Sequence, residues 1–230
     1  MITWTILIAT IGQRRDLLAR LLGGLLPQVA AAGGRVKVLA YWDSGEITKR
    51  LGTALGAIAF KRQALLDAAT SDYVCSLDDD DWVSDDYIAS ILEALDQRPD
   101  MVGFTMEVRK NGRHHQLGLI SLRYGGWSQT VDGTYLRDIT HANPMRTEIA
   151  RTATFTDRHG GPEDTAWVGQ LRAGGLLRTE VVIDRVLHHY DWVVDRSSWT
   201  APRRVVATSR TGKPWQRLEV DSPHFAYLDS

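Results

Sequence analysis

Short apolar stretches alternate with amphipathic stretches through the first hundred residues of the chain. Residues 5–11 are apolar and rich in β-branched side chains, which predicts a strand. Leucines spaced for one helix face follow, and Pro27 and Gly33-Gly34 are expected to break that helix. The same order recurs in a strand at 36–42, a helix at 57–69 and a strand at 72–77. Strands that alternate with helices predict an α/β fold, with a mostly parallel sheet and helices on both faces.

The pattern changes after residue 100. A helix beginning near Ser84 or Asp85 is expected to reach about Asp96, before Pro99. Two strand-like segments, 102–108 and 117–122, flank Asn111-Gly112, which predicts an antiparallel hairpin insertion. A helix at 163–173 and a strand at 180–187 follow. We therefore expect one domain over residues 1–195 and a C-terminal extension over residues 196–230.

Composition narrows the class of protein. The chain has 230 residues, 43% of them hydrophobic and 24% charged, as in ordinary globular domains. No apolar window approaches the ~20 residues of a membrane span, and the start lacks a cationic leader, so we expect a cytoplasmic protein. The formal net charge of −1 does not favour nucleic-acid binding. The single cysteine, Cys75, lies in an apolar strand and is expected to be a packed thiol.

Two acidic clusters carry the candidate chemistry. Residues 78–81 are four consecutive aspartates directly after a predicted strand, and Glu163-Asp164 opens a predicted helix. Adjacent carboxylates repel one another, so a cation is expected to neutralise the first cluster. Oxygen ligands favour Mg²⁺, Mn²⁺ or Ca²⁺. Asp43 ends the preceding strand, and ligands of parallel sheets bind beyond such carboxyl ends.

Each of these features also has a purely structural interpretation. The four aspartates can form a solvated turn that caps the next helix. Glu163 and Asp164 are favoured in a first helical turn by the helix dipole alone. Asp43, with Ser44-Gly45, can form an ordinary Asx turn.

The order of these motifs resembles the GT-A glycosyltransferases of family 2, over roughly residues 4–190. The resemblance rests on the strand ending at Asp43, the segment 56–65, the strand 73–77 with its aspartates, and Gly161-Pro162-Glu163-Asp164. It implies a GT-A, Rossmann-like fold with a nucleotide-binding half at about 1–100 and an acceptor half at about 101–195. Short chains of this family also occur in bacteriophages.

The resemblance implies roles for both acidic clusters. Asp78 and Asp80 form an Asp-x-Asp pair, with Asp80 the direct ligand of Mn²⁺ or Mg²⁺. His188-His189 stands where several members supply a third metal ligand; His189 is preferred, and an imidazole ligand would favour Mn²⁺. Asp164, beside Glu163, is the candidate general base.

The resemblance also implies a set of donor contacts near the strand ends. The family places basic residues and an acidic residue against the nucleobase and diphosphate. Here Gln63 replaces a common Asn, and the stretch between Asp43 and Gly56 is short. The implied nucleotide-sugar-binding residues are Thr10, Asp43, Lys61, Arg62, Asp78, Asp79, His141 and Arg146.

The function implied is metal-dependent, inverting transfer of a sugar from a nucleoside-diphosphate sugar to a hydroxyl acceptor. A UDP-sugar is the first donor to test, and the acceptor can be a glycan, a small molecule or a protein. One alternative is a sugar nucleotidyltransferase, although only Gly12 follows the first strand where a glycine-rich phosphate loop is expected. The other is a non-catalytic nucleotide- or saccharide-binding module.

Overall fold

A computed structural model describes residues 1–43, 45–52, 54–156, 163–192 and 225–228. The Gly160-Gly161-Pro162 segment and most of the extension predicted at 196–230 lie outside these ranges. Within them, no helix combines the length and apolar character needed to cross a bilayer.

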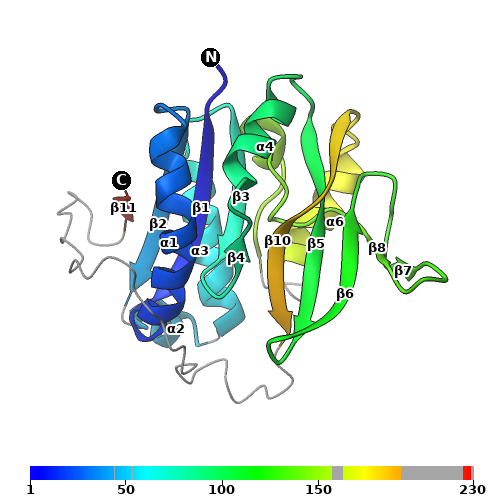
Figure 1. Cartoon of the computed structure of the whole chain (residues 1–230). Helices are drawn as coiled ribbons and strands as arrows, with labels where there is room; N and C mark the ends of the chain where they lie inside the picture. The colour runs from blue at the N-terminus through cyan, green and yellow to red at the C-terminus, as the bar shows by residue number, and fades with distance from the viewer. Residues whose placement is uncertain (44, 53, 157–162, 193–224, 229–230) are drawn as a thin grey trace.

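The first half of the chain follows the alternation predicted from its sequence (Figure 1). Three parallel strands carry it, because β1 pairs with both β2 and β3. Their carboxyl ends, Ile11, Asp43 and Asp78, meet at one edge of the sheet. The elements are β1 Trp4–Ile11, a 3₁₀ turn at Gly12–Arg14, α1 Arg15–Ala31, β2 Val36–Asp43, α2 Glu46–Leu51, α3 Ala54–Ala68, β3 Tyr73–Asp78, β4 Trp82–Val83 and α4 Tyr87–Leu95.

The second half extends the same sheet. β5 runs beside β10 in parallel and beside β6 and β9 in antiparallel orientation. The sheet order is β11-β2-β1-β3-β9-β5-β6-β8-β7, with β10 paired to β4 and β5. The elements are β5 Met101–Lys110, β6 Arg113–Ile120, β7 Ser128–Gln129, β8 Tyr135–Arg137, β9 Met145–Arg146, α5 Thr147–Ala150, α6 Glu163–Gly174, β10 Glu180–Trp192 and β11 Phe225–Tyr227.

Helices cover both faces of the sheet, as the mostly parallel arrangement requires. Figure 1 shows α1 and α4 on one face and α3 and α6 on the other. Successive strand residues point to opposite faces, so Ile6 and Ile8 pack in the core beneath α1 and α4, whereas Leu7 packs in the core beneath α3 and α6. The α/β class predicted from the periodicity is confirmed.

The predicted hairpin turn is confirmed, but the hairpin is part of the main sheet and not an insertion. Asn111 and Gly112 both adopt positive φ, 51° and 79°, as a two-residue hairpin turn requires. The strands it joins are not an appended insertion, because β5 lies inside the main sheet between β9, β10 and β6. This pairing depends on residues distant in the chain, which a turn motif does not report.

Of the two predicted breaks of the first helix, Pro27 does not end it, whereas the helix does end before Gly33-Gly34. α1 continues to Ala31 with Pro27 inside it. Leu25 and Val29, on either side of the proline, are both buried against the sheet. Gln28 donates from Nε2 to the carbonyl of Gly24 at 2.9 Å. Burial of the apolar face therefore outweighs the local penalty of proline.

Candidate active site

The two acidic clusters meet at the carboxyl ends of the strands. Arg62, on α3, donates through Nη2 to Asp78 at the end of β3 and through Nη1 to Glu163 at the start of α6. Its side chain is only 4% exposed. A single buried guanidinium thus joins residues that are far apart in the sequence.

His141 makes a second connection between the clusters. Its Nε2 lies 3.6 Å from Oδ2 of Asp78, and its Nδ1 lies 3.4 Å from Oδ2 of Asp164. The backbone holds the ring there, because the amide of Ser76 donates to the carbonyl of His141 at 2.7 Å. Buried Asn143 anchors the same loop by donating to the carbonyl of Val102 at 3.0 Å.

The charges at this junction shift each other's protonation. Burial and Arg62 lower the pKa of His141, but Asp78 and Asp164 outweigh them and raise it to about 9. Burial opposes ionisation of Asp164, yet His141 and then Arg62 hold its pKa well below the ordinary value. Burial raises the pKa of Glu163. At neutral pH the structure therefore holds an ionised Asp164 beside a protonated imidazole.

Asp79 and Asp80 of the first cluster face the end of β1. Arg14 contacts Oδ1 of Asp79 at 2.8 Å and Oδ2 of Asp80 at 2.7 Å. Thr10 donates to Asp79 at 2.6 Å. Asp79 is fully buried, and burial raises its pKa to about 7. Arg14 was not among the predicted site residues, although its position one turn beyond β1, at the edge where the aspartates lie, could have indicated it.

Asp81 and the two histidines of β10 complete the acidic loop. Nε2 of His188 lies 2.8 Å from Asp81, and both side chains are buried. His189 turns instead to Glu107, with Nδ1 at 2.7 Å, and stacks on Trp82. The buried member of the pair is therefore His188, whereas His189, the one preferred from the sequence, has a side chain that is 20% exposed. Metal binding by His189 stays a prediction.

Asp43 and Lys61 form a separate buried pair at the end of β2. Nζ of Lys61 lies 2.6 Å from Asp43 and donates to the carbonyl of Thr10 at 2.8 Å. The other carboxylate oxygen of Asp43 accepts from the amide of Gly45. The structure thus places Asp43 beside the predicted site with both oxygens engaged, and its contact with a nucleobase stays a prediction.

Arg146 is the predicted site residue that the fold separates from the others. It pairs with Tyr73, the first residue of β3, whereas Asp78 is the last. Its guanidinium contacts Asp100 at 3.3 Å and donates to the carbonyl of Arg98 at 2.6 Å. Its sequence neighbourhood resembles a site segment, but β9 carries it to the opposite end of the sheet.

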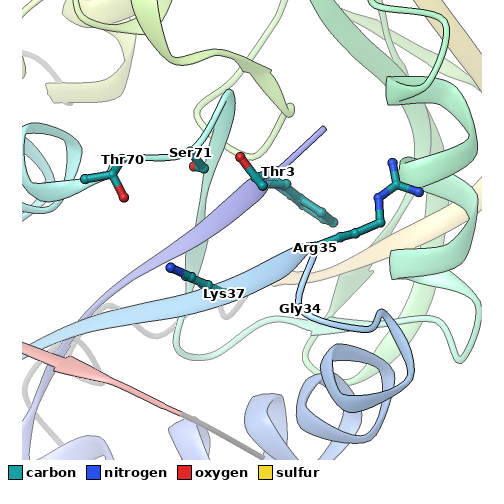
Figure 2. Close-up of a pocket in the computed structure, with 7 residues that line it drawn as sticks. Thr3, Gly34, Arg35, Lys37, Thr70 and Ser71 are labelled. Atoms are coloured by element: carbon teal, nitrogen blue, oxygen red, sulfur yellow. The ribbon is translucent and has the colours of Figure 1, made fainter. Parts of the chain in front are cut away.

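A pocket also opens at that opposite end. It measures about 140 Å³ and lies at the amino ends of β1 and β2. Figure 2 shows Thr3, Arg35, Lys37 and Ser71 around it. This pocket is separate from the acidic clusters.

Asp78 and Asp80 could supply one or two carboxylate ligands to a hard divalent cation, with water and diphosphate oxygens as its remaining ligands. Asp78 and Asp80 retain side-chain exposures of 30% and 21% on one loop. Among the described residues, no group of three His, Cys, Asp or Glu side chains is placed to hold a metal. One or two carboxylates completed by water and diphosphate oxygens is the usual Mg²⁺ arrangement.

Comparisons with known proteins agree with this architecture. Residues 54–150 match the family model described as glycosyl transferase family 2. This segment includes the aspartate run and His141 but ends before Asp164. A search of curated proteins finds no significant match.

Solved structures of TarS from S. aureus are similar in fold. The TarS 1–349 structure is 15% identical with a TM-score of 0.58 and covers 83% of this chain and 60% of TarS 1–349. TarS 1–349 in complex with UDP is 14% identical with a TM-score of 0.59, and the match covers 83% of this chain and 61% of TarS 1–349. TarS 1–349 in complex with UDP-GlcNAc is also 14% identical with a TM-score of 0.59, and the match covers 83% of this chain and 59% of TarS 1–349. The chain thus spans about 60% of the TarS 1–349 length. Residues 54–150 are therefore similar to glycosyl transferase family 2, and the chain shares its fold with the TarS structures.

Proposed function

We propose that the protein transfers a sugar from a nucleoside-diphosphate sugar to an acceptor hydroxyl by a single, inverting displacement. The observation that carries this proposal is the junction of Asp78 and Asp164 around His141. Two carboxylates from distant segments lie near one imidazole, which supports assigning one to the donor and the other to the base. The TarS structures named for complexes with UDP and UDP-GlcNAc make UDP-sugars the first donors to test.

Asp164 is the base in this proposal. Its side chain is 31% exposed in the first turn of α6 and is ionised by its neighbours. It takes the acceptor hydroxyl proton while that oxygen bonds to the anomeric carbon and the bond to the diphosphate breaks. The contact with His141 that ionises Asp164 also weakens it as a base. An acceptor that displaces His141 would restore its basicity.

Asp80 and Asp78 would hold Mn²⁺ or Mg²⁺ in the donor complex. The bound cation would stabilise the charge that develops on the leaving diphosphate. Arg14 and Arg62 already contact these two aspartates and would orient them for donor binding. Metal dependence, inversion and a cytoplasmic location stay predictions.

The test separates chemistry from donor binding. Asp164→Asn keeps the shape of the side chain but removes the base, so transfer should fall by about 10² to 10⁴. Binding of UDP with Mn²⁺, followed as an increase in Tm, should survive. Asp85→Asn, at an exposed aspartate beyond the acidic run, is the matched control. It should retain both the transfer rate and the binding of UDP with Mn²⁺. Loss of transfer and donor binding together in Asp164→Asn, or of neither, would contradict the assigned role.

A nucleotide panel tests the class of reaction. UDP, GDP, CDP and dTDP with and without Mn²⁺ should show a selective increase in Tm for one nucleotide with metal. Release of pyrophosphate from a nucleoside triphosphate and a sugar phosphate would instead indicate a nucleotidyltransferase. Nucleotide binding with neither donor hydrolysis nor transfer would indicate a binding module.

A further inference from the structure

Arg137 is a cation that the mechanism above does not use. It ends β8, and its side chain is half-buried. Arg14, Arg62 and Lys61 each contact a carboxylate, whereas no described carboxylate lies within ion-pair distance of Arg137. Its Nη1 instead lies 3.2 Å from Sδ of Met106.

Neighbouring strands shape the space that this arginine occupies. Gly118 on β6 lies between β8 and Met106 on β5. A Cβ at Gly118 would lie 3.0 Å from Cγ of Met106 and 3.7 Å from Cδ of Arg137. The glycine therefore lets the arginine stem pass across β6 towards the centre of the sheet.

An exposed tryptophan covers the guanidinium. Cζ of Arg137 lies 3.6 Å from the ring centroid of Trp127, and that ring packs edge-on against Tyr135 at 6.2 Å. Trp127 remains 66% exposed. Such rings stack on sugar faces, and the cation–π contact holds the planar guanidinium against the indole.

Burial and three more distant acidic groups act on the charge of Arg137. Burial lowers its pKa to about 10, and Tyr190, Asp164 and Asp81 partly oppose that effect. Withdrawing a charge from water without a direct counter-charge is unfavourable. An arginine kept in this state, with donors unpaired by carboxylate, suits a ligand that brings its own negative charge.

We propose that Arg137 and Trp127 form an acceptor subsite for a saccharide that carries an anionic group, either phosphate or carboxylate. This inference rests on the proposed transferase function. The acceptor is favoured over the donor because the expected nucleotide contacts Thr10 and Asp43, with Lys61 bound to both, lie at the ends of β1 and β2. In the sheet order, β3, β9, β5 and β6 separate β8 from these strands. The guanidinium would pair with the anion while the indole packs on the sugar ring.

Binding of model saccharides tests the inference without any turnover. We would titrate the full chain, labelled at its tryptophan indole nitrogens, with glucose 6-phosphate, glucuronate, glucose and inorganic phosphate, using Trp127→Phe to assign the Trp127 resonance. The Trp127 signal should shift with at least one anionic sugar, and the apparent Kd for glucose should be at least about tenfold higher. The preferred anionic sugar distinguishes phosphate from carboxylate. Inorganic phosphate should bind more weakly than that sugar.

Variants then assign the binding. Arg137→Gln should weaken binding of the preferred anionic sugar at least about tenfold, and Arg137→Lys should retain part of it. Arg178→Gln removes an exposed arginine before β10, at the other end of the sheet, and should change nothing. Equal binding of glucose and the anionic sugars to the unmodified chain, or unchanged binding in Arg137→Gln, would overturn the inference. Because no donor is present, either result leaves the transferase proposal to its own test.

Discussion

The two ends of the parallel strands hold their charges in different ways. At the carboxyl ends, Arg62 and Lys61 have side chains that are 4% exposed. Arg62 lies between two carboxylates, and Lys61 pairs with one. At the amino ends, Arg35 pairs with Asp96, which is 54% exposed, beside the pocket of Figure 2. One sheet thus has a buried, shared ion network at one end and separate surface pairs at the other.

This difference teaches where function is concentrated. Surface ion pairs contribute little to stability, whereas buried charges are costly unless each is well paired. A fold that retains a buried network has not minimised that cost. Perturbed ionisable groups gathered at one edge of a sheet are typical of functional sites. The contrast supports placing the chemistry at the carboxyl ends.

The largest expected effect is on the free energy of unfolding, when an arginine is replaced at each end of the strands. Arg62→Met leaves Asp78 and Glu163 without their shared cation and should reduce the free energy of unfolding by about 3–5 kcal/mol. Arg35→Met at the other end should reduce it by less than about 1 kcal/mol. Urea unfolding of both variants at neutral pH measures the difference. Equal losses would show that the two ends do not differ energetically.

A smaller effect should appear in the pH dependence of stability. The pKa of His141 is raised in the folded chain to about 9, so its stabilising contribution is complete below its ordinary pKa and is lost as pH rises through about 9. His141→Gln should therefore destabilise the chain by on the order of 1–3 kcal/mol at pH 6 and by less at pH 9.5.

Unfolding at several pH values provides this measurement. His115→Gln, at an exposed histidine of β6, is the control and should lower stability by a similar small amount at every pH. If the loss of stability in His141→Gln stays constant from pH 6 to pH 9.5, the neighbouring carboxylates do not keep this imidazole protonated in the folded chain.

The smallest expected effect is at Arg146. It contacts Asp100 and the Arg98 carbonyl at the amino end of the sheet, so Arg146→Gln should change stability by no more than about 1 kcal/mol. Donor affinity and transfer rate should stay within about twofold of the unmodified chain, since the side chain does not reach the acidic clusters. A large increase in the KM for the donor would break the comparison between the two ends.

The local patterns predicted much of the architecture. Periodicity identified the alternating strands and helices, and Asn111-Gly112 identified a hairpin turn whose backbone angles match. The rule that ligands bind beyond parallel strand ends placed Asp43 and Asp78 on one edge, where the structure has them. Each inference used only neighbouring residues or the common direction of parallel strands.

Other features depended on contacts between distant segments. The position of Arg14 just beyond β1 could indicate that it lies near the site, but not that it pairs with both Asp79 and Asp80. No local pattern indicates that His188 rather than His189 meets Asp81. The same holds for Arg137, whose place depends on Gly118 one strand away. These contacts are set by sheet order and register, which sequence spacing does not encode.

The sequence by itself determined the kinds of element, their order and the two acidic clusters, because periodicity and turn chemistry act over a few residues. The tertiary structure alone decided that one arginine and one histidine would join those clusters, that Pro27 would stay within α1 and that Arg146 would lie at the far end. Packing of the whole sheet governs these outcomes, since burial of a face can outweigh the preference of any single residue.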